Sequence, residues 1–361
     1  MALLKIHTDR IIDNIEKINA FMTSHDKQWS LVVKVLGNDK ATLSAILNHS
    51  CIDQIHSIAV SQVNNLRLVK GIHPGIRTLY IKPPAIKNAS LVVKYADISI
   101  NSSGLVIQAL NEAAKKQDKR HRIIIMIEMG ELREGIKREG LISFYKNVFK
   151  LSNIEVVGLG TNLGCMFGIQ PTYDKLIQLV LYQQLLEAKF KRKLPIVSGA
   201  SSITLPLLHK NKMPEGVNHF RIGEAAFLGT SPLNDQQFLD LNTGAFTFEA
   251  NIVELYRKAS QPDGEISQAA VGHAEIPAEE NDAGVENYRA VVDFGILDVD
   301  ADYLIPEDPS VIFSGNSSDM TVYDLGDNPS NYETGDVLRF RLKYLAAAKL
   351  MYSNYVEKKL V

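Results

Sequence analysis

Residues 31–39 of the chain read Leu-Val-Val-Lys-Val-Leu-Gly-Asn-Asp, a short apolar run that meets the basic residue Lys34 and then leads into a polar turn. A valine-rich run of this length before glycine and asparagine is typical of a buried β-strand. Burying an amine at a strand end costs hydration and favours its neutral, nucleophilic form. Lys34 is therefore a candidate covalent anchor for a carbonyl group, although an isolated lysine at a strand end more often extends into solvent.

The chain from residue 8 to about residue 230 repeats this pattern, with short β-branched runs separated by helical segments. One such segment places Leu176, Leu179 and Val180 on one face of a helix. The alternation predicts βα units around a parallel sheet. Eight units predict a TIM (β/α)8 barrel, whereas a doubly wound open sheet would account for six of them. The eight runs are 29–34, 57–62, 77–82, 96–102, 122–129, 154–162, 195–200 and 219–223.

The last third of the chain has longer strand-like runs and no helical pattern of comparable length between them. It predicts an all-β domain, with the acidic stretch 261–286 as a long loop inside it. The predicted fold is thus α/β: a TIM barrel over residues 8–232, followed by a C-terminal all-β domain over 233–361, to which residues 1–7 can add a strand. The strand-like runs are 246–258, 287–294, 310–313, 320–323 and 337–344.

Composition limits the classes of function. The 361 residues, 45% of them hydrophobic, suffice for one large core or two moderate ones. The 39 basic and 41 acidic residues nearly balance and form no long basic block, so nucleic acid is not an expected partner. The two cysteines provide neither a disulfide framework nor zinc-ligand spacing, and no apolar stretch reaches membrane-spanning length. We therefore expect a cytoplasmic protein without a metal centre or a membrane partner.

Polar residues stand at the carboxyl ends of six predicted strands, where a barrel gathers its reactive groups. After the eighth strand, Arg221 leads into Gly223 and Glu224 at a helix start. The amides there can bind a phosphate, and Ser201 and Ser202 after the seventh strand add hydroxyl groups nearby. Together they predict a phosphate site, although each residue taken singly also fits an ordinary turn or cap. The six strand-end residues are Lys34, Asn101, Glu128, Asn162, Ser198 and Arg221.

An amine after the first strand and a phosphate site after the seventh and eighth match the layout that pyridoxal 5'-phosphate needs. The chain resembles the fold type III pyridoxal-phosphate enzymes, the family of alanine racemase and its ornithine and lysine racemase relatives. The resemblance spans nearly the whole chain in the family's order, and the second, third and fifth motifs are most similar to the ornithine racemase branch. The motifs are VVKVLG at 32–37, IEMGELREGI at 127–136, GLGTNLGC at 158–165, RIGEA at 221–225 and SSDM at 317–320.

The resemblance implies that Lys34 carries the cofactor through its ε-amine and acts as one catalytic base. Arg221 would face the pyridine nitrogen. Because a guanidinium keeps its proton, this nitrogen stays unprotonated and the ring is a weaker electron sink, which suits racemisation and suppresses transamination. Arg133 would lie near the phenolic oxygen of the cofactor, and Asn162 against its ring. The residues implied for the phosphate are Ser201, Ser202, Gly223, Glu224 and Tyr352, and those implied for the substrate are Ser318 and Asp319.

Three departures from the alanine racemases bear on the mechanism. Met126 stands where they place a lysine, often carbamylated, seven residues before Arg133. Asn38 replaces a phosphate-binding tyrosine, and the region 267–269 lacks the tyrosine that serves as second base from the partner subunit's β-domain. His273 is the candidate for this second acid or base, because an imidazole exchanges protons near neutral pH.

We therefore expect a pyridoxal-phosphate-dependent amino-acid racemase that removes the α-proton from an external aldimine on one face and returns a proton on the other. The resemblance favours a basic amino acid such as ornithine. The alternatives are an alanine racemase and a non-catalytic pyridoxal-phosphate-binding protein for cofactor homeostasis, although such proteins usually end after the barrel. A decarboxylase or aldolase would need catalytic cysteines or a metal cluster. We expect a head-to-tail homodimer, because a barrel mouth needs a lid that excludes water.

Overall fold

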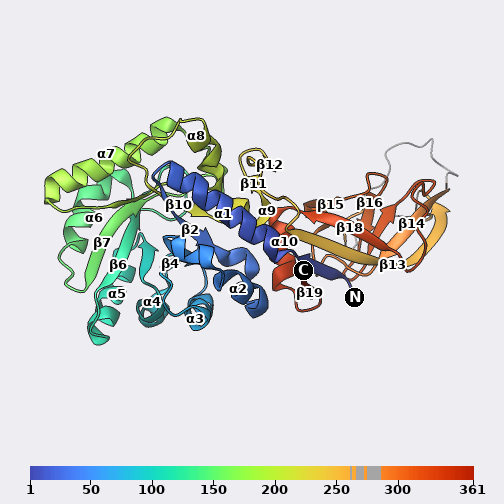
Figure 1. The fold of residues 1–361 in the computed structure, drawn as a ribbon, viewed down its shortest axis with the longest axis horizontal. Coiled ribbons are helices and arrows are strands. Elements are labelled where there is room, and N and C mark those ends of the chain that lie inside the picture. The colour runs from blue at the N-terminus through green and yellow to red at the C-terminus, as the bar shows by residue number, and fades with distance from the viewer. Residues whose placement is uncertain (261, 266–271, 275–285) are drawn as a thin grey trace. The chain divides into compact units, whose positions relative to one another are not determined.

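The computed structural model describes residues 1–260, 262–265, 272–274 and 286–361 of the chain. They form two compact units, one made of Arg10–Thr243 and the other of Met1–Asp9 together with Gly244–Val361 (Figure 1). The domain bounds 8–232 and 233–361 remain a prediction about which parts of the chain fold independently. Within the described residues, no helix is both long and apolar enough to cross a bilayer.

The larger unit is a closed barrel of parallel strands. Its sheet runs in the order β8-β7-β6-β5-β4-β3-β2-β10-β9, and β9 (Ala200–Ser201) continues β8 beyond Gly199. Because the two ends of this order are consecutive pieces of one strand, the sheet closes on itself. The predicted TIM barrel is therefore confirmed, and the open sheet is excluded. The other strands are β2 (Gln28–Val32), β3 (Ser57–Val60), β4 (Thr78–Tyr80), β5 (Ile98–Asn101), β6 (His121–Met126), β7 (Ile154–Gly160), β8 (Ile196–Ser198) and β10 (His219–Ile222).

Helices alternate with these strands and cover the outside of the barrel (Figure 1). Helix α1 buries Ile11, Ile15 and Ile18 on one face, at the spacing of the helical repeat. Asp39 caps α2 by accepting the amide of Thr42 at 2.8 Å, which satisfies one of the amides that a helix start leaves unpaired. The helices are α1 (Thr8–Ser24), α2 (Lys40–Leu47), α3 (Val63–Ile72), α4 (Ala89–Tyr95), α5 (Gly104–Lys116), α6 (Leu141–Val148), α7 (Tyr173–Phe190), α8 (Leu205–His209) and α9 (Glu224–Leu228).

The barrel strands enclose an apolar core. Val32, Ile98, Ile124 and Met126 belong to it, and each is at most 6% exposed. Met126 is fully buried, so a charged side chain at this position would lose its hydration. The apolar residue Met126 therefore suits this core, at the position where the resemblance to alanine racemases implies a lysine.

The smaller unit is built on a largely antiparallel sheet in the order β15-β18-β13-β14-β17-β16. Strand β1 (Leu3–Ile6) pairs antiparallel with β13 and parallel with β19 (Glu357–Leu360), so both chain ends join this sheet. Phe248, Phe294 and Phe340 pack with ring centroids 5.1 to 6.2 Å apart and form its core. The remaining strands are β13 (Phe246–Ala259), β14 (Glu286–Val292), β15 (Leu304–Pro306), β16 (Ile312–Asn316), β17 (Thr321–Asp324) and β18 (Val337–Leu342).

One element of this unit differs from the sequence-based expectation. Residues 337–344 are predicted as a single strand, but β18 ends at Leu342 and helix α10 (Tyr344–Tyr352) follows. The run 345–350, Leu-Ala-Ala-Ala-Lys-Leu, has high helix propensity, and α10 buries Ala346, Ala347 and Leu350. The predicted loop 261–286 lies largely outside the described residues.

Candidate active site

Lys34 lies immediately beyond the carboxyl end of β2. It belongs to a single turn of 3-10 helix, η1 (Val33–Leu36), which Gly37 ends with a φ of 56°. Glycine adopts this left-handed conformation without the steric cost of a Cβ atom. The Gly37 carbonyl accepts a hydrogen bond from Nδ2 of Asn65 at 2.8 Å, which fixes the turn against α3. The local sequence thus holds Lys34 at the mouth of the barrel.

The surroundings of Lys34 favour its uncharged form. The residue is exposed by accessible surface, yet protein atoms crowd the ε-amine, and the hydration it loses lowers its pKa. At a concave mouth, a side chain can keep partial access to solvent while its amine loses part of its hydration. Cys165 and Glu224 oppose the lowering of the pKa, and Arg133 adds to it. The amine is therefore biased toward the state that attacks a carbonyl.

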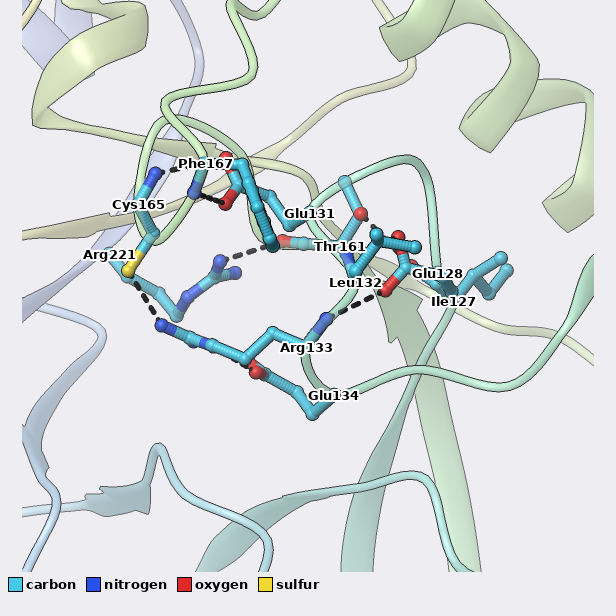
Figure 2. Close-up of polar contacts among 10 residues, drawn as sticks. All are labelled: Ile127, Glu128, Glu131, Leu132, Arg133, Glu134, Thr161, Cys165, Phe167 and Arg221. Carbon is cyan, nitrogen blue, oxygen red and sulfur yellow. Dashed lines mark hydrogen bonds and ion pairs between the residues drawn. The ribbon is translucent and has the colours of Figure 1, made fainter.

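Arg221 is a buried cation on β10. It is 8% exposed, and its guanidinium donates to the Thr161 carbonyl at 2.8 Å (Figure 2). It also donates to the Ser198 carbonyl at 2.7 Å and the Ser198 hydroxyl at 2.5 Å. Burial lowers its pKa to about 10, with Glu134 opposing and Arg133 assisting, so the guanidinium stays charged at neutral pH. Residues at the ends of β7 and β8 therefore hold a fixed positive charge.

Glu134 holds Arg133 in the loop after β6 (Figure 2). Nη2 of Arg133 donates to the carboxylate of Glu134 at 2.7 Å, and Nε donates to the same carboxylate. Nη1 donates to the sulfur of Cys165 at 2.6 Å. The Glu134 side chain is 9% exposed, so water screens this pair less than a surface pair. Glu134 raises the pKa of Arg133, and this chain therefore supplies a local carboxylate to orient the arginine.

Glu131 ties the loop after β6 to the loop after β7 (Figure 2). Its carboxylate accepts the amides of Cys165 at 3.0 Å, Phe167 at 3.0 Å and Ile169 at 2.9 Å. Burial opposes ionisation of this carboxyl, but the amides outweigh burial and lower its pKa. Glu131 is 2% exposed, because the loop that it holds covers it. This clamp keeps Cys165 beside Arg133.

We expect Glu131→Gln to reduce the free energy of unfolding by about 2 kcal/mol, because an amide oxygen is a weaker acceptor for these N–H groups than a carboxylate. The folded-state pKa is lowered, so the stabilisation is complete above the unfolded pKa of about 4.3 and is lost as the pH falls through the folded pKa. Urea unfolding at pH 7 and pH 3 measures the difference in unfolding free energy between the wild-type protein and the variant. This difference should be smaller at pH 3. Glu139→Gln, exposed after the same strand, is the control. Equal unfolding free energies at pH 7 would contradict the clamp.

The four phosphate candidates of the barrel lie where β9 and β10 end. The hydroxyl of Ser202 accepts the amides of Gly223 at 3.4 Å and Ala225 at 3.3 Å, both long for hydrogen bonds. A Cβ atom on Gly223 would lie 3.1 Å from the Val32 carbonyl oxygen, so glycine allows this turn to pack against the end of β2. The turn is thereby next to the strand that leads to Lys34. The four candidates are Ser201, Ser202, Gly223 and Glu224.

Asn162 follows β7 and has an unsatisfied amide. Its buried Nδ2 has no hydrogen-bond partner among the residues that the structure describes. Leaving such a donor unpaired costs about 1–3 kcal/mol. The position therefore favours an acceptor atom on a bound ligand.

The carboxyl of Glu224 is also perturbed. Burial raises its pKa to about 7, Asp235 raises it further, and Thr230 and Lys34 lower it. The hydroxyl of Thr230 donates to Glu224 at 3.4 Å. This carboxyl is close enough to the amine of Lys34 to interact with it electrostatically, and its backbone starts α9.

We expect Glu224→Gln to stabilise the apoprotein at pH 8 but not at pH 5. The folded pKa is raised, so the wild-type contribution is fully present below the ordinary pKa and is lost as the pH rises through about 7. Glutamine removes the buried charge and should raise the melting temperature at pH 8 by about 2–4 °C. Scanning calorimetry at both pH values checks this, with the exposed Glu215→Gln as control. A stabilisation of equal size at pH 5 would point to packing instead.

The remaining candidates belong to the smaller unit. His273 is exposed, its amide donates to Oδ1 of Asn316 at 3.0 Å, and its carbonyl accepts the Asn316 amide at 2.8 Å. These bonds align its backbone with β16. Ser318 and Asp319 form the turn between β16 and β17, and Tyr352 ends α10 with half its surface exposed. The region 267–269 lies outside the described residues.

Reasoning from the sequence missed Glu131, Glu134 and Cys165. The structure brings the eight barrel candidates to the carboxyl ends of the strands. Glu131 and Cys165 connect the loops after β6 and β7 there, and Glu134 pairs with Arg133 within the first of these loops. Acidic residues on both sides of Arg133 were the available signal, because a partly buried arginine needs a counter-charge. The contact with Cys165 joins loops of different βα units, which no local pattern predicts.

A cavity of about 430 Å³ opens at the other end of the barrel. Trp29, His56 and Arg77 are among the residues that line it, and they lie near the amino-terminal ends of β2, β3 and β4. Active sites of TIM barrels form at the carboxyl ends of the strands. The site around Lys34 and Arg221 is therefore the candidate active site, and this cavity is not.

Comparison with known proteins gives the family. Residues 6–232 match the family profile described as alanine racemase, N-terminal domain. The chain is 34% identical to the ornithine racemase of Acetoanaerobium sticklandii over 99% of both chains, and 34% identical to the lysine racemase of Thermotoga maritima over 74% of this chain and 73% of that protein. Its fold is similar to that of the alanine racemase from Bartonella henselae, whose crystal structure has covalently bound pyridoxal phosphate. The TM-score is 0.71 at 15% sequence identity, and the alignment covers 100% of this chain and 99% of that one.

The profile covers more than half of the chain, and the relative from Acetoanaerobium sticklandii aligns with nearly all of it. These matches agree with the closed barrel and the separate β-sheet unit. The chain therefore belongs to the alanine racemase family of pyridoxal 5'-phosphate-dependent enzymes and is an amino-acid racemase.

Proposed function

We propose that this racemase interconverts the L and D forms of a basic amino acid, with ornithine favoured. The observation that supports this substrate class is the alignment of nearly the whole chain with an ornithine racemase, together with the lysine racemase match. Alanine remains the alternative substrate. The solved alanine racemase structures support the fold alone, because their sequence identity is low.

The residues at the barrel mouth fit pyridoxal 5'-phosphate. When bound, this cofactor supplies an aldehyde that bonds to a lysine amine and a ring that stabilises negative charge at the substrate Cα. Lys34 offers an amine with a lowered pKa, and Asn162 offers a buried donor that lacks a partner within the described residues. The long bonds from the amides of Gly223 and Ala225 to Ser202 are ones that a phosphate oxygen could replace. The barrel residues proposed for the phosphate are Ser201, Ser202, Gly223 and Glu224. The resemblance to the family also implies Tyr352 of the smaller unit.

The charges of this chain divide the proton chemistry. Lys34, in its neutral form, takes or returns the proton at the substrate Cα on one face. Arg221 donates hydrogen bonds but releases no proton. It therefore leaves the ring nitrogen of the cofactor unprotonated, which suppresses transamination as a side reaction. Arg133, paired with Glu134, would stand near the phenolic oxygen as a fixed donor. The cation and its carboxylate would keep this position without a carbamylated lysine.

The opposite face needs a second acid or base, and we propose His273 for this role. We also propose a head-to-tail homodimer in the cytoplasm, in which one protomer's smaller unit covers its partner's barrel mouth. Ser318 and Asp319 would then contact the substrate. His273 is supported by its exposure and by the suitability of imidazole for proton transfer near neutral pH.

We expect His273→Ala to lower the racemisation rate by about 10²-fold or more, the usual contribution of a positioned acid or base. Because Lys34 still serves one face, one enantiomer should continue to exchange its α-hydrogen with solvent. Proton NMR in D2O measures exchange and chirality analysis measures racemisation in the same sample. Equal loss of exchange for both enantiomers would count against His273 as a base for a single face.

A deuterium-exchange screen tests the substrate class. The purified holoenzyme is incubated in D2O with L-ornithine, L-lysine, L-alanine and L-serine, and loss of the α-proton signal is followed. We expect ornithine and lysine to exchange faster than the other two. Faster exchange of alanine would contradict the proposal. Bound cofactor without exchange of any amino acid would favour the non-catalytic binding protein.

A further inference from the structure

A line of hydrogen-bonded side chains runs through the barrel interior behind Arg221. Nη1 of Arg221 donates to the Ser198 hydroxyl at 2.5 Å, and this oxygen lies 2.9 Å from Nδ1 of His219. Nε2 of His219 lies 2.9 Å from the Ser30 hydroxyl, which lies 2.6 Å from the hydroxyl of Ser57. The last four residues are fully buried. Such buried polar groups depend on one another for their hydrogen bonds.

His219 occupies the place where the barrel closes. It is two residues before Arg221 on β10, so both side chains point to the same side of the strand. Strand β10 pairs with β2, which carries Ser30, and with β9, which follows directly on the strand of Ser198. The imidazole therefore bridges the strands that flank Arg221, and its position is set by the closure of the sheet.

The buried position of His219 favours its uncharged form. Burial, reinforced by His56 and Arg221, lowers its pKa well below the ordinary value. The ring of His56 packs edge-on against it at 4.9 Å between centroids. Burial, with Arg77 and Arg122, also lowers the pKa of His56 to about 4. A neutral imidazole has one nitrogen that donates and one that accepts.

Arg221 fixes the direction of the protons along this line. A guanidinium only donates, so the Ser198 oxygen accepts from it and directs its own proton elsewhere. If that proton goes to Nδ1 of His219, then Nε2 carries the ring hydrogen and donates to Ser30. In the opposite tautomer, an N–H dipole would direct its positive end at an oxygen that already binds a cation. The first arrangement is therefore favoured electrostatically.

We propose that His219, as its neutral Nε2–H tautomer, is a positioning residue. It orients the Ser198 hydroxyl and thereby holds the Arg221 guanidinium toward the ring nitrogen of the cofactor. The inference rests on the proposed role of Arg221. It differs from an ordinary core histidine in what its loss would change. The guanidinium would gain freedom to turn, and the ring nitrogen would lose a fixed donor that cannot protonate it. Racemisation would slow, and half-transamination would compete better.

The first test needs no cofactor. Selective 15N labelling of histidine in the apoprotein reports which ring nitrogen is protonated, and the His219 signals are assigned by their loss in His219→Gln. We expect the Nε2–H tautomer without titration between pH 6 and pH 8.5, and a mixture of tautomers in Ser198→Ala. A protonated ring or the Nδ1–H tautomer in the wild-type protein would overturn the proposal.

The second test separates positioning from structure. In half-transamination the amino group moves from the substrate to the cofactor, which gives a 2-oxo acid and pyridoxamine phosphate in equal amounts. Absorbance at the pyridoxamine band and chirality analysis give the ratio of racemisation to this side reaction. For His219→Gln we expect kcat to fall about tenfold with little change in KM, as for a misoriented group, and the ratio to fall with it.

His121→Gln is the matched control. His121 is also buried in the barrel and lies 2.8 Å from the hydroxyl of Ser99, on strands β6 and β5 rather than beside Arg221. Its replacement should leave the ratio unchanged. If both variants change the ratio equally, His219 is only structural.

Should the wild-type protein racemise no amino acid, the proposed function fails. The tautomer measured in the apoprotein still decides how the hydrogen bonds along the line are arranged. Ser30→Ala provides a second variant if His219→Gln does not fold.

Discussion

Replacement of Lys34 by alanine should abolish covalent attachment of pyridoxal 5'-phosphate and lower racemisation by at least about 10³-fold, because one residue supplies both the anchor and a base. Its position beyond β2 and its lowered pKa prepare the amine for attack on an aldehyde. Borohydride reduction followed by peptide mass spectrometry should find the cofactor label on Lys34 of the wild-type protein. Absorbance of the dialysed variant should show no bound cofactor.

Lys40→Ala is the control for this prediction. Lys40 is exposed at the start of α2, six residues further along the chain, and its loss should leave both labelling and racemisation intact. The rate at which apoprotein captures the aldehyde should rise with pH through a value below the ordinary pKa of lysine. A label on a different lysine, or capture that follows an unshifted lysine pKa, would contradict the assignment.

The fold could be predicted from the sequence because the barrel strands are marked locally. Most of the strands are short valine- or isoleucine-rich runs, and turns follow them, as after β2 and β6. The helix α10 was missed because 337–344 alternates apolar and polar residues as a strand does, while the alanines that favour a helix come just after. A boundary between two such signals depends on tertiary packing.

The site could be predicted in part for the same reason. In a barrel, the carboxyl ends of the strands converge, so Lys34 and Arg221 could be expected at one mouth without any knowledge of contacts. The partners of those residues are a different matter. The contacts of Arg133 with Cys165 and of His219 with Ser198 depend on loop conformation and on the closure of the sheet. Spacing along the chain carries little information about such contacts.

Arg221→Lys is expected to be destructive although it keeps the charge. The guanidinium reaches the carbonyl of Thr161 and both oxygens of Ser198 with one planar group, whereas an ammonium offers donors from a single atom. At least one buried oxygen should then lose its partner, which costs about 1–3 kcal/mol of unfolding free energy. Burial and the nearby Arg133 would also favour loss of the lysine proton.

The catalytic consequence should exceed the loss of stability. We expect racemisation by Arg221→Lys to fall about 10²–10³-fold, because a donor displaced by about an ångström no longer faces the ring nitrogen. Transamination should fall less, so its share of turnover rises. Urea unfolding of the apoprotein and the ratio of the two reactions in the holoenzyme measure the two effects separately. Arg138→Lys, an exposed arginine after β6, controls for the substitution itself. A guanidinium that governs the ring nitrogen cannot be exchanged for an ammonium without changing how often the substrate carbanion is reprotonated at Cα. A stable variant with an unchanged ratio of racemisation to transamination would therefore mean that Arg221 sets only the structure of the barrel mouth.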